Sequence, residues 1–364
     1  MRCLVLITAL AAVLQAGQPF PKRLVADYGY WSRTQKPPYS SAQIPFNKVT
    51  HINHAGVSFN ADGSLNVPDG FLEPELISGA HAAGVKVLLL LGGDFTGLES
   101  TSGGVQILLG NLLTFISTNG YDGLDIDWEY PSSSADTQLF YTLMIGLRRT
   151  FPRPNYYLSA DIPPWGGAYD IPGVEPAIDY YNIMMYDCAG PWTDDGQQNS
   201  PIFPNPNNPE PWECEPGSAE QAANVFLDEY HVPADKLNMG TPFYGYVYTN
   251  VNQVYGPCHP CNGHTVVAEP YGTYIKWRVN QLGWTAYFDR KSIVPYLLRT
   301  DGSPGFITYD NPLSTYMRVW YSDWKRGLGG TFMWSLDQDY DGHTQDLLDA
   351  MYQATWNQPF VEPK

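Results

Sequence analysis

Eight apolar or alternating runs recur along the chain, and longer, often helix-like segments separate them. The runs cover residues 23–31, 48–60, 84–93, 121–131, 156–164, 180–187, 236–248 and 327–337, and clear helical patterns lie at 74–84, 104–120 and 134–150. Apolar strands that alternate with helices predict a parallel sheet covered on both faces. Eight such units predict an α/β fold of the closed (β/α)8 TIM-barrel type. A doubly wound open sheet is the alternative, but no glycine-rich phosphate loop follows any of the strands.

The interval between the seventh and eighth runs is the longest, at about 78 residues, roughly twice what one helix and two loops require. We therefore predict a small α+β insertion at 249–312 that packs on the barrel and forms one wall of a cleft. The expected organisation is a signal peptide at 1–16, barrel strands 1–7 within 17–248, the insertion, and strand 8 with a C-terminal helix within 313–364.

The N-terminus has the pattern of a secretory signal peptide. Arg2 precedes an apolar stretch from Leu4 to Leu14, and the small residues Ala16 and Gly17 follow at a suitable cleavage point. This stretch is too short to span a membrane. The sequence therefore predicts a secreted, extracellular, soluble protein without a membrane partner, and a monomer is the default expectation.

Cysteine usage agrees with export. Of the five cysteines one lies in the signal peptide, and the remaining four predict two disulfide bonds with three possible pairings. We favour Cys188–Cys214 and Cys258–Cys261. The segment 258–264 could instead form a zinc knuckle with His259 and His264, but it lacks a second ligand pair at zinc spacing.

The formal net charge is −17, and the sequence has no Lys/Arg cluster. A nucleic-acid partner is therefore excluded, and anionic membranes and polyanionic substrates are disfavoured. A neutral or weakly cationic substrate remains, although acidity also serves simply to keep a secreted protein soluble. The 26 Tyr, 15 Phe and 11 Trp residues fit both an aromatic core and a cleft that stacks on sugar rings.

The fourth run contains four carboxylates within eight positions. Because side chains alternate faces along a strand, one face carries acidic residues and the other carries apolar ones. The first face holds Gly123, Asp125, Asp127 and Glu129, and the second holds Leu124, Ile126 and Trp128, with Asp122 out of phase. If the acidic face points into a barrel, at least one carboxyl group must be protonated or heavily hydrogen-bonded. A solvated edge strand and a cation site are alternatives, but acid chemistry by Glu129 at the strand's carboxyl end is the main interpretation.

Two other runs carry chemistry at the same end. The sixth ends with Met184, Tyr186 and Asp187, and the eighth carries Trp334. Taken singly, Tyr186 and Trp334 are equally consistent with core packing. At matching strand ends, together with the acidic strand, they predict one pocket.

These motifs together resemble glycoside hydrolase family 18, the chitinase family. The signature D-x-x-D-x-D-x-E is present from Asp122 to Glu129, and M-x-Y-D is present from Met184 to Asp187. Residues 239–245 and 327–334 resemble the family's seventh and eighth strands. The CxxC segment and 306–311 resemble the small insertion of its deep-cleft branch.

The resemblance implies substrate-assisted, retaining hydrolysis of β-1,4 N-acetylglucosamine polymers, without cofactor or metal. It makes Glu129 the general acid/base, Asp127 the residue that orients the 2-acetamido group, and Asp125 its proton-sharing partner. Tyr186 would bind the acetamido oxygen and Asp187 the distorted sugar. Trp334 would form the cleft floor, and Tyr28, Met184, Tyr244 and Trp192 would line the cleft. The implied partners are chitin and N-acetylchitooligosaccharides.

Four positions depart from the family pattern. Leu90 stands where a serine usually supports the inner aspartates, Asp94 where an aromatic often follows, and Tyr246 where an arginine often contacts the residue equivalent to Asp187. His54 replaces a common aromatic, and a neutral core histidine is the favoured interpretation.

Two alternatives to a chitinase therefore remain open. A chitin-binding lectin on the same barrel is one, although such relatives typically lose the catalytic glutamate and Glu129 is present. An endo-N-acetylglucosaminidase is the other, although such relatives often lack the tyrosine that is present here as Tyr186.

Overall fold

The structure is a computed structural model that describes residues 22–100, 102–208, 217–279 and 281–362. The expected signal peptide at 1–16 lies outside the described residues, as does Cys214 of the expected Cys188–Cys214 bond. Eight parallel strands form a closed barrel in the order β1-β2-β4-β5-β6-β7-β8-β14, closed where β14 pairs with β1. The TIM-barrel prediction is confirmed, and each of the eight runs contains one barrel strand. Their bounds are β1 Arg23–Gly29, β2 His51–Phe59, β4 Lys86–Gly92, β5 Gly123–Asp127, β6 Tyr157–Ile162, β7 Tyr180–Ile183, β8 Leu237–Pro242 and β14 Gly330–Trp334.

Helices cover the outside of the barrel. The three predicted from sequence are α2 Pro74–Ala82, α3 Gly104–Asn119 and α4 Ser134–Thr150, and the others include α5 Ile171–Val174, α6 Ala219–Asn224, α8 Pro312–Trp320, α9 Leu336–Asp339 and α10 Asp346–Thr355. Helix α4 begins at a capping box, in which Ser133 and Asp136 satisfy each other's backbone N–H groups. It then buries Leu139, Leu143 and Leu147 at the spacing of one helical face. Within the described residues, no helix is both long and apolar enough to cross a bilayer.

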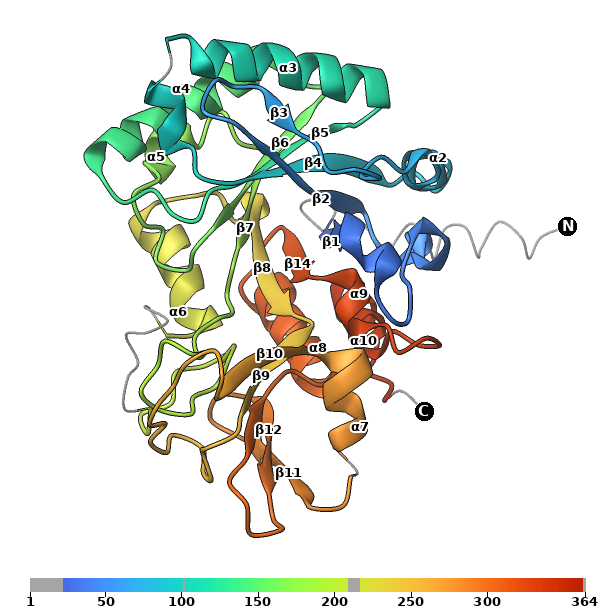
Figure 1. Ribbon diagram of the computed structural model, residues 1–364, viewed down its shortest axis with the longest axis vertical. Coiled ribbons are helices and arrows are strands. Elements are labelled where there is room, and N and C mark those ends of the chain that lie inside the picture. Colours follow the sequence, from blue (N-terminus) through green and yellow to red (C-terminus); the bar gives the residue numbers. More distant parts are fainter. Residues whose placement is uncertain (1–21, 101, 209–216, 280, 363–364) are drawn as a thin grey trace, which may run out of the picture.

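A second, antiparallel sheet is inserted between β8 and β14. Its strands are β9 Tyr244–Tyr248, β10 Val266–Pro270, β11 Trp284–Asp289, β12 Val294–Arg299 and β13 Phe306–Thr308, paired in the order β10-β9-β13-β12-β11. Figure 1 shows this sheet, with the short helix α7 Lys276–Arg278, at the end of the molecule opposite α3 and α4. Strand β9 begins directly after β8, so the sheet draws on residues that precede 249.

Two contacts fix parts of the inserted region. Arg318 of α8 is completely buried and forms an ion pair with Asp310, which follows β13, at 3.3 Å. The expected Cys258–Cys261 disulfide is present. Both sulfur atoms are therefore taken, and the zinc-knuckle alternative loses its two thiolate ligands.

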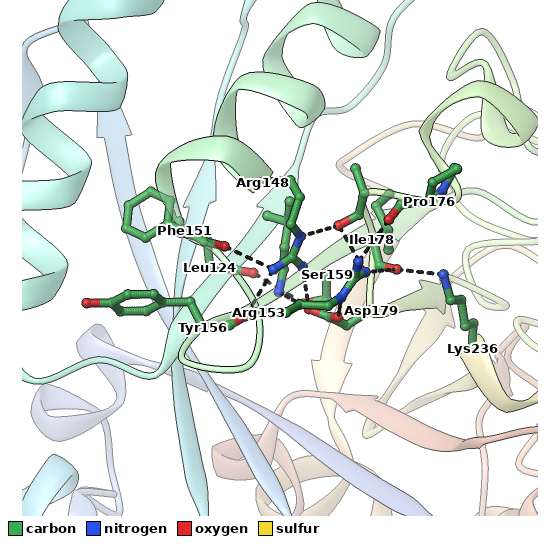
Figure 2. Close-up of polar contacts among 12 residues, drawn as sticks. Leu124, Arg148, Phe151, Arg153, Tyr156, Ser159, Pro176, Ile178, Asp179 and Lys236 are labelled. Carbon is green, nitrogen blue, oxygen red and sulfur yellow. Dashed lines mark hydrogen bonds and ion pairs between the residues drawn. The ribbon is translucent and has the colours of Figure 1, made fainter.

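The amino ends of three barrel strands are held by a cluster around Asp179, which directly precedes β7. Figure 2 shows Arg148 of α4 and Arg153 directed at Asp179 and at neighbouring backbone carbonyls. The Asp179 carboxylate also accepts the backbone N–H of Leu158 at 2.7 Å, and Lys236 donates to the carbonyl of Ile178 at 2.9 Å. These contacts stabilise the amino-terminal end of the barrel. The cleft lies at the opposite end, where the strands have their carboxyl ends.

Candidate active site

Strand β5 has the two faces that its alternation predicts. Leu124, Ile126 and Trp128 are buried outside the barrel wall, and the Trp128 ring lies 5.3 Å from Phe95 and 6.3 Å from Phe140 of α4. Asp125 is completely buried on the inner face. The strand ends at Asp127, so Glu129 follows just beyond the end of the strand, at the rim of the barrel.

A cleft of about 520 Å³ opens at this end of the barrel. It brings together eight of the ten residues expected in the site, which are Asp127, Glu129, Met184, Tyr186, Asp187, Trp192, Tyr244 and Trp334. Its remaining lining residues were not expected, namely Tyr130, Asp161, Pro164 and Trp165. Asp125 lies beneath Asp127 on the same strand face. Tyr130, Trp165 and Trp192 expose 40–49% of their surface, so aromatic faces are available along the cleft.

Tyr28 does not line the cleft, and that expectation is corrected. On β1 the neighbouring Asp27 faces the barrel interior, so the alternation of the strand turns Tyr28 outward. Its ring is buried and stacks on His54 at 5.5 Å, and its hydroxyl donates to Glu73 at 2.7 Å. His54 belongs to the same aromatic layer, where burial lowers its pKa to about 3. It is therefore a neutral core histidine.

Four carboxyl groups on three strands lie inside the barrel, at the floor of the cleft or below it. They are Asp27 of β1, Asp125 and Asp127 of β5, and Asp161 of β6. Asp27 accepts a hydrogen bond from the Asn53 amide at 2.9 Å. Within the described residues, no group of three or more His, Cys, Asp or Glu side chains is placed to hold a metal ion.

A serine on β6, on the other side of β5, takes the place of the serine that the third barrel strand lacks. Leu90 of β4 stands in register with Asp125 and offers no hydrogen bond. Ser159 of β6 also stands in register with Asp125, and its hydroxyl donates to the carboxylate. The inner aspartate thus keeps a hydroxyl donor despite the change at position 90.

Burial dominates the ionisation of the inner carboxyl groups. It raises the pKa of Asp125 to about 6, a value held down by hydrogen bonds from Ser159 and Asp161. Burial, together with the charge of Asp125, raises the pKa of Asp27 and of Asp161 well above the usual range. The pKa of Asp127 also lies well above that range, because of burial and then the charges of Glu129 and Asp125. At neutral pH the structure therefore favours one inner anion, Asp125, among protonated neighbours.

Glu129 has the environment of a general acid. Burial of its carboxyl group raises its pKa, and the negative charge of Asp187 adds to this, whereas hydrogen bonds from Tyr130 and Asp127 oppose it. The carboxyl group consequently holds its proton to a higher pH than a glutamate in water does, which a proton donor near neutral pH requires.

Asp187 is held by hydroxyl groups rather than by a cation. Its backbone lies in the left-handed region, with φ of 61°, and its N–H donates to the Asn199 side chain at 2.9 Å. Its carboxylate accepts the Tyr246 hydroxyl at 2.8 Å and the Tyr244 hydroxyl as well. Tyr246 thus supplies a hydrogen-bond donor to Asp187 at the position where an arginine was expected.

Asp94, the third departure, has a local role. Its carboxylate accepts the Thr96 backbone N–H at 3.0 Å and the Thr96 hydroxyl at 2.7 Å, so it stabilises an exposed turn after β4. It does not line the cleft. The aromatic wall is instead supplied by Tyr130 and Trp165, whose rings lie 5.6 Å apart.

The chain matches one protein family and is similar to several known proteins and solved structures. The family described as "Glycosyl hydrolases family 18" matches residues 23–339. A probable endochitinase of Caenorhabditis elegans is 27% identical over 279 residues, which is 70% of this chain but 44% of that protein, so this chain spans less than half of that relative. The Group IV chitinase of Ostrinia furnacalis, solved in complex with allosamidin, superposes with a TM-score of 0.80 at 24% identity and covers 91% of this chain and 97% of its own. Human YKL-39, described as a pseudo-chitinase with retained chitooligosaccharide binding properties, superposes with a TM-score of 0.80 at 20% identity and covers 92% and 99%.

Proposed function

This chain belongs to family 18 of the glycosyl hydrolases, and we propose that it is a chitinase that cleaves β-1,4 linkages between N-acetylglucosamine units. The observation that carries the proposal is a single glutamate with a raised pKa, Glu129, directly above Asp127 in a cleft with aromatic walls. Glu129 is placed at the rim to act as the acid, and the second participant in the proposed reaction is the substrate's own 2-acetamido group.

The reaction begins when Glu129 protonates the glycosidic oxygen. The acetamido oxygen attacks the anomeric carbon as the glycosidic bond breaks. A cyclic oxazolinium ion forms, and the sugar on the leaving side is released. Asp127 shares its proton with Asp125 below it and accepts the acetamido N–H on its carbonyl oxygen. The negative charge of this pair stabilises the positive charge of the oxazolinium ion. Glu129 then takes a proton from water, which opens the ring with net retention of configuration.

Three further groups orient the sugar. Tyr186 donates its hydroxyl to the acetamido oxygen, and Asp187, fixed by Tyr244 and Tyr246, accepts from a sugar hydroxyl. Trp334 packs against the apolar face of the ring. No step requires a metal or an organic cofactor. The signal-like N-terminus supports action on chitin outside the cell.

The test is digestion of N-acetylchitohexaose by the wild type and by Glu129→Gln, with α and β anomers resolved at early times. We expect β product first from the wild type and a loss of roughly 10²-fold or more in the variant, since the acid is removed while its shape is kept. If both proteins bind the hexamer and neither cleaves it, the protein is a lectin. If the wild type instead cleaves only between the core sugars of N-glycans, it is an endo-N-acetylglucosaminidase.

A further inference from the structure

Asp161 belongs to the site, although neither sequence motif contains it. It lies near the carboxyl end of β6, in register with Asp127 of the neighbouring strand β5. It contributes to the cleft lining but is only 2% exposed. A side chain in this position lies under the substrate and next to the acids that are proposed to act on it.

One amide group joins Asp161 to Asp125. The Asn182 side chain, from β7, donates from its nitrogen to Asp161 at 2.9 Å and to Asp125 at 3.4 Å. Its oxygen accepts from the Asn238 amide at 2.9 Å, and the oxygen of Asn238 accepts from the Arg23 guanidinium at 3.0 Å. Among the described residues, the Arg23 guanidinium is therefore linked to the two carboxyl groups through two neutral amides.

The two carboxyl groups cannot both be ionised at low cost, because they are buried and share one amide donor. Asp125 has the better support for a charge, since Ser159 also donates to it. Within the described residues, its second oxygen is buried and has no donor from a non-acidic group. A proton on Asp161 would supply that donor.

Other titratable groups around Asp161 do not change this assignment. They are Asp125 and Asp127 on β5, Asp27 on β1, Tyr186 beyond β7, and Tyr169 before α5. None of these groups is a cation, and the three carboxyl groups favour a protonated, neutral Asp161 over a charged one. Burial and the charge of Asp125 also raise the pKa of Asp161 well above the usual range, in agreement with the hydrogen-bond pattern.

We propose that Asp161 is a positioning residue of the catalytic site, whose O–H donates to Asp125 and keeps the proton of the Asp125–Asp127 pair on Asp127. The proposal rests on the proposed chitinase function. Without this donor the Asp125 carboxylate is more basic and withdraws the proton from Asp127, the side chain that meets the substrate. Asp161 itself does not contact the reacting atoms.

The decisive comparison is between Asp161→Asn and Asp161→Ala. The asparagine amide can donate to Asp125 as the protonated acid does, whereas alanine cannot. We expect Asp161→Ala to lower kcat roughly tenfold or more with KM little changed, and Asp161→Asn to restore most of that loss. The acid limb of the pH profile of kcat/KM should move to higher pH in the alanine variant, since lost donation raises the pKa of Asp125. Ser159→Ala, which removes the other donor, should move the same limb in the same direction.

Several results would overturn the proposal while the wild type still cleaves the hexamer. These are equal losses in the Asn and Ala variants, a loss confined to KM, or an unmoved acid limb in Asp161→Ala. A readout without substrate separates this inference from the proposed function. If Asp161 is neutral in the fold, the chain must take up a proton on folding at neutral pH, so Asp161→Asn should raise the unfolding temperature more near pH 8 than near pH 5. An Asp161 that is already ionised at pH 5 predicts the same change at both pH values, which would overturn the proposal.

Discussion

The ionised Asp125 carboxylate should destabilise the fold at neutral pH, so Asp125→Asn is expected to stabilise the protein while reducing hydrolysis. In the folded state the pKa of Asp125 is about 6, against an ordinary value of 3.8. Between these two pH values the folded protein binds more protons than the unfolded chain, so stability falls as pH rises through this window. Above about pH 6 the full penalty is present, and below about pH 4 most of it is absent.

The size of the effect follows from that difference. About two pKa units at 1.36 kcal/mol each give about 3 kcal/mol of destabilisation that the asparagine removes. With an unfolding entropy of about 2.1 cal/mol/K per residue, a chain of this length changes its Tm by roughly 4 °C for that free energy. The asparagine oxygen can still accept from Ser159 and Asn182, so the existing hydrogen bonds need not be lost.

The assay is differential scanning calorimetry of both proteins at about pH 4 and about pH 7.5, at one scan rate. Asp125→Asn should raise Tm at the higher pH and leave it nearly unchanged at the lower one. Asp69→Asn, which removes an exposed carboxylate, is the matched control and should show no such pH dependence. A variant that is equally destabilised at both pH values would refute the reasoning, because the buried charge would then carry no penalty.

Three further predictions concern activity. Tyr246→Phe removes the hydroxyl that meets Asp187 at 2.8 Å and should lower kcat/KM on the hexamer roughly tenfold, whereas Tyr248→Phe on the same strand should not. Asp187→Asn removes a negative charge that raises the pKa of Glu129, so the alkaline limb of the pH–rate profile should move to lower pH. Trp165→Ala removes an exposed aromatic wall of the cleft and should raise KM for the hexamer several-fold with kcat less affected, as steady-state kinetics would measure.

The barrel could be predicted from the sequence because the patterns that define it are local. The run at 121–131 alternates carboxylates with Leu124, Ile126 and Trp128, and burial of the apolar face dictates which face turns inward. Since all parallel strands of a barrel present their carboxyl ends to one rim, Tyr186 and Trp334 could also be placed beside Glu129.

What escaped prediction depends on phase and register, which are not local. The sequence of β1 alone does not determine which side of the strand Tyr28 faces. In the structure Asp27 points into the barrel, so Tyr28 points outward. The roles of Asp161 and Ser159 follow from their register with Asp127 and Asp125 across two strands. A sequence read one strand at a time contains no signal for that pairing, although an acidic residue within an otherwise apolar run at 156–164 was a visible irregularity.

At two of the positions that depart from the family pattern, Leu90 and Tyr246, the structure provides a hydrogen-bond donor to the neighbouring aspartate from another residue type or another strand. Each inward residue of a barrel has a registered neighbour on both sides, so Ser159 on β6 can serve Asp125 when β4 offers Leu90. Likewise two tyrosines hold Asp187 where a guanidinium was expected. Tyrosine hydroxyls are neutral, and none of the described residues that line the cleft is basic. Protons must therefore balance the carboxyl groups here, which ties catalysis to pH values at which Asp127 and Glu129 remain protonated.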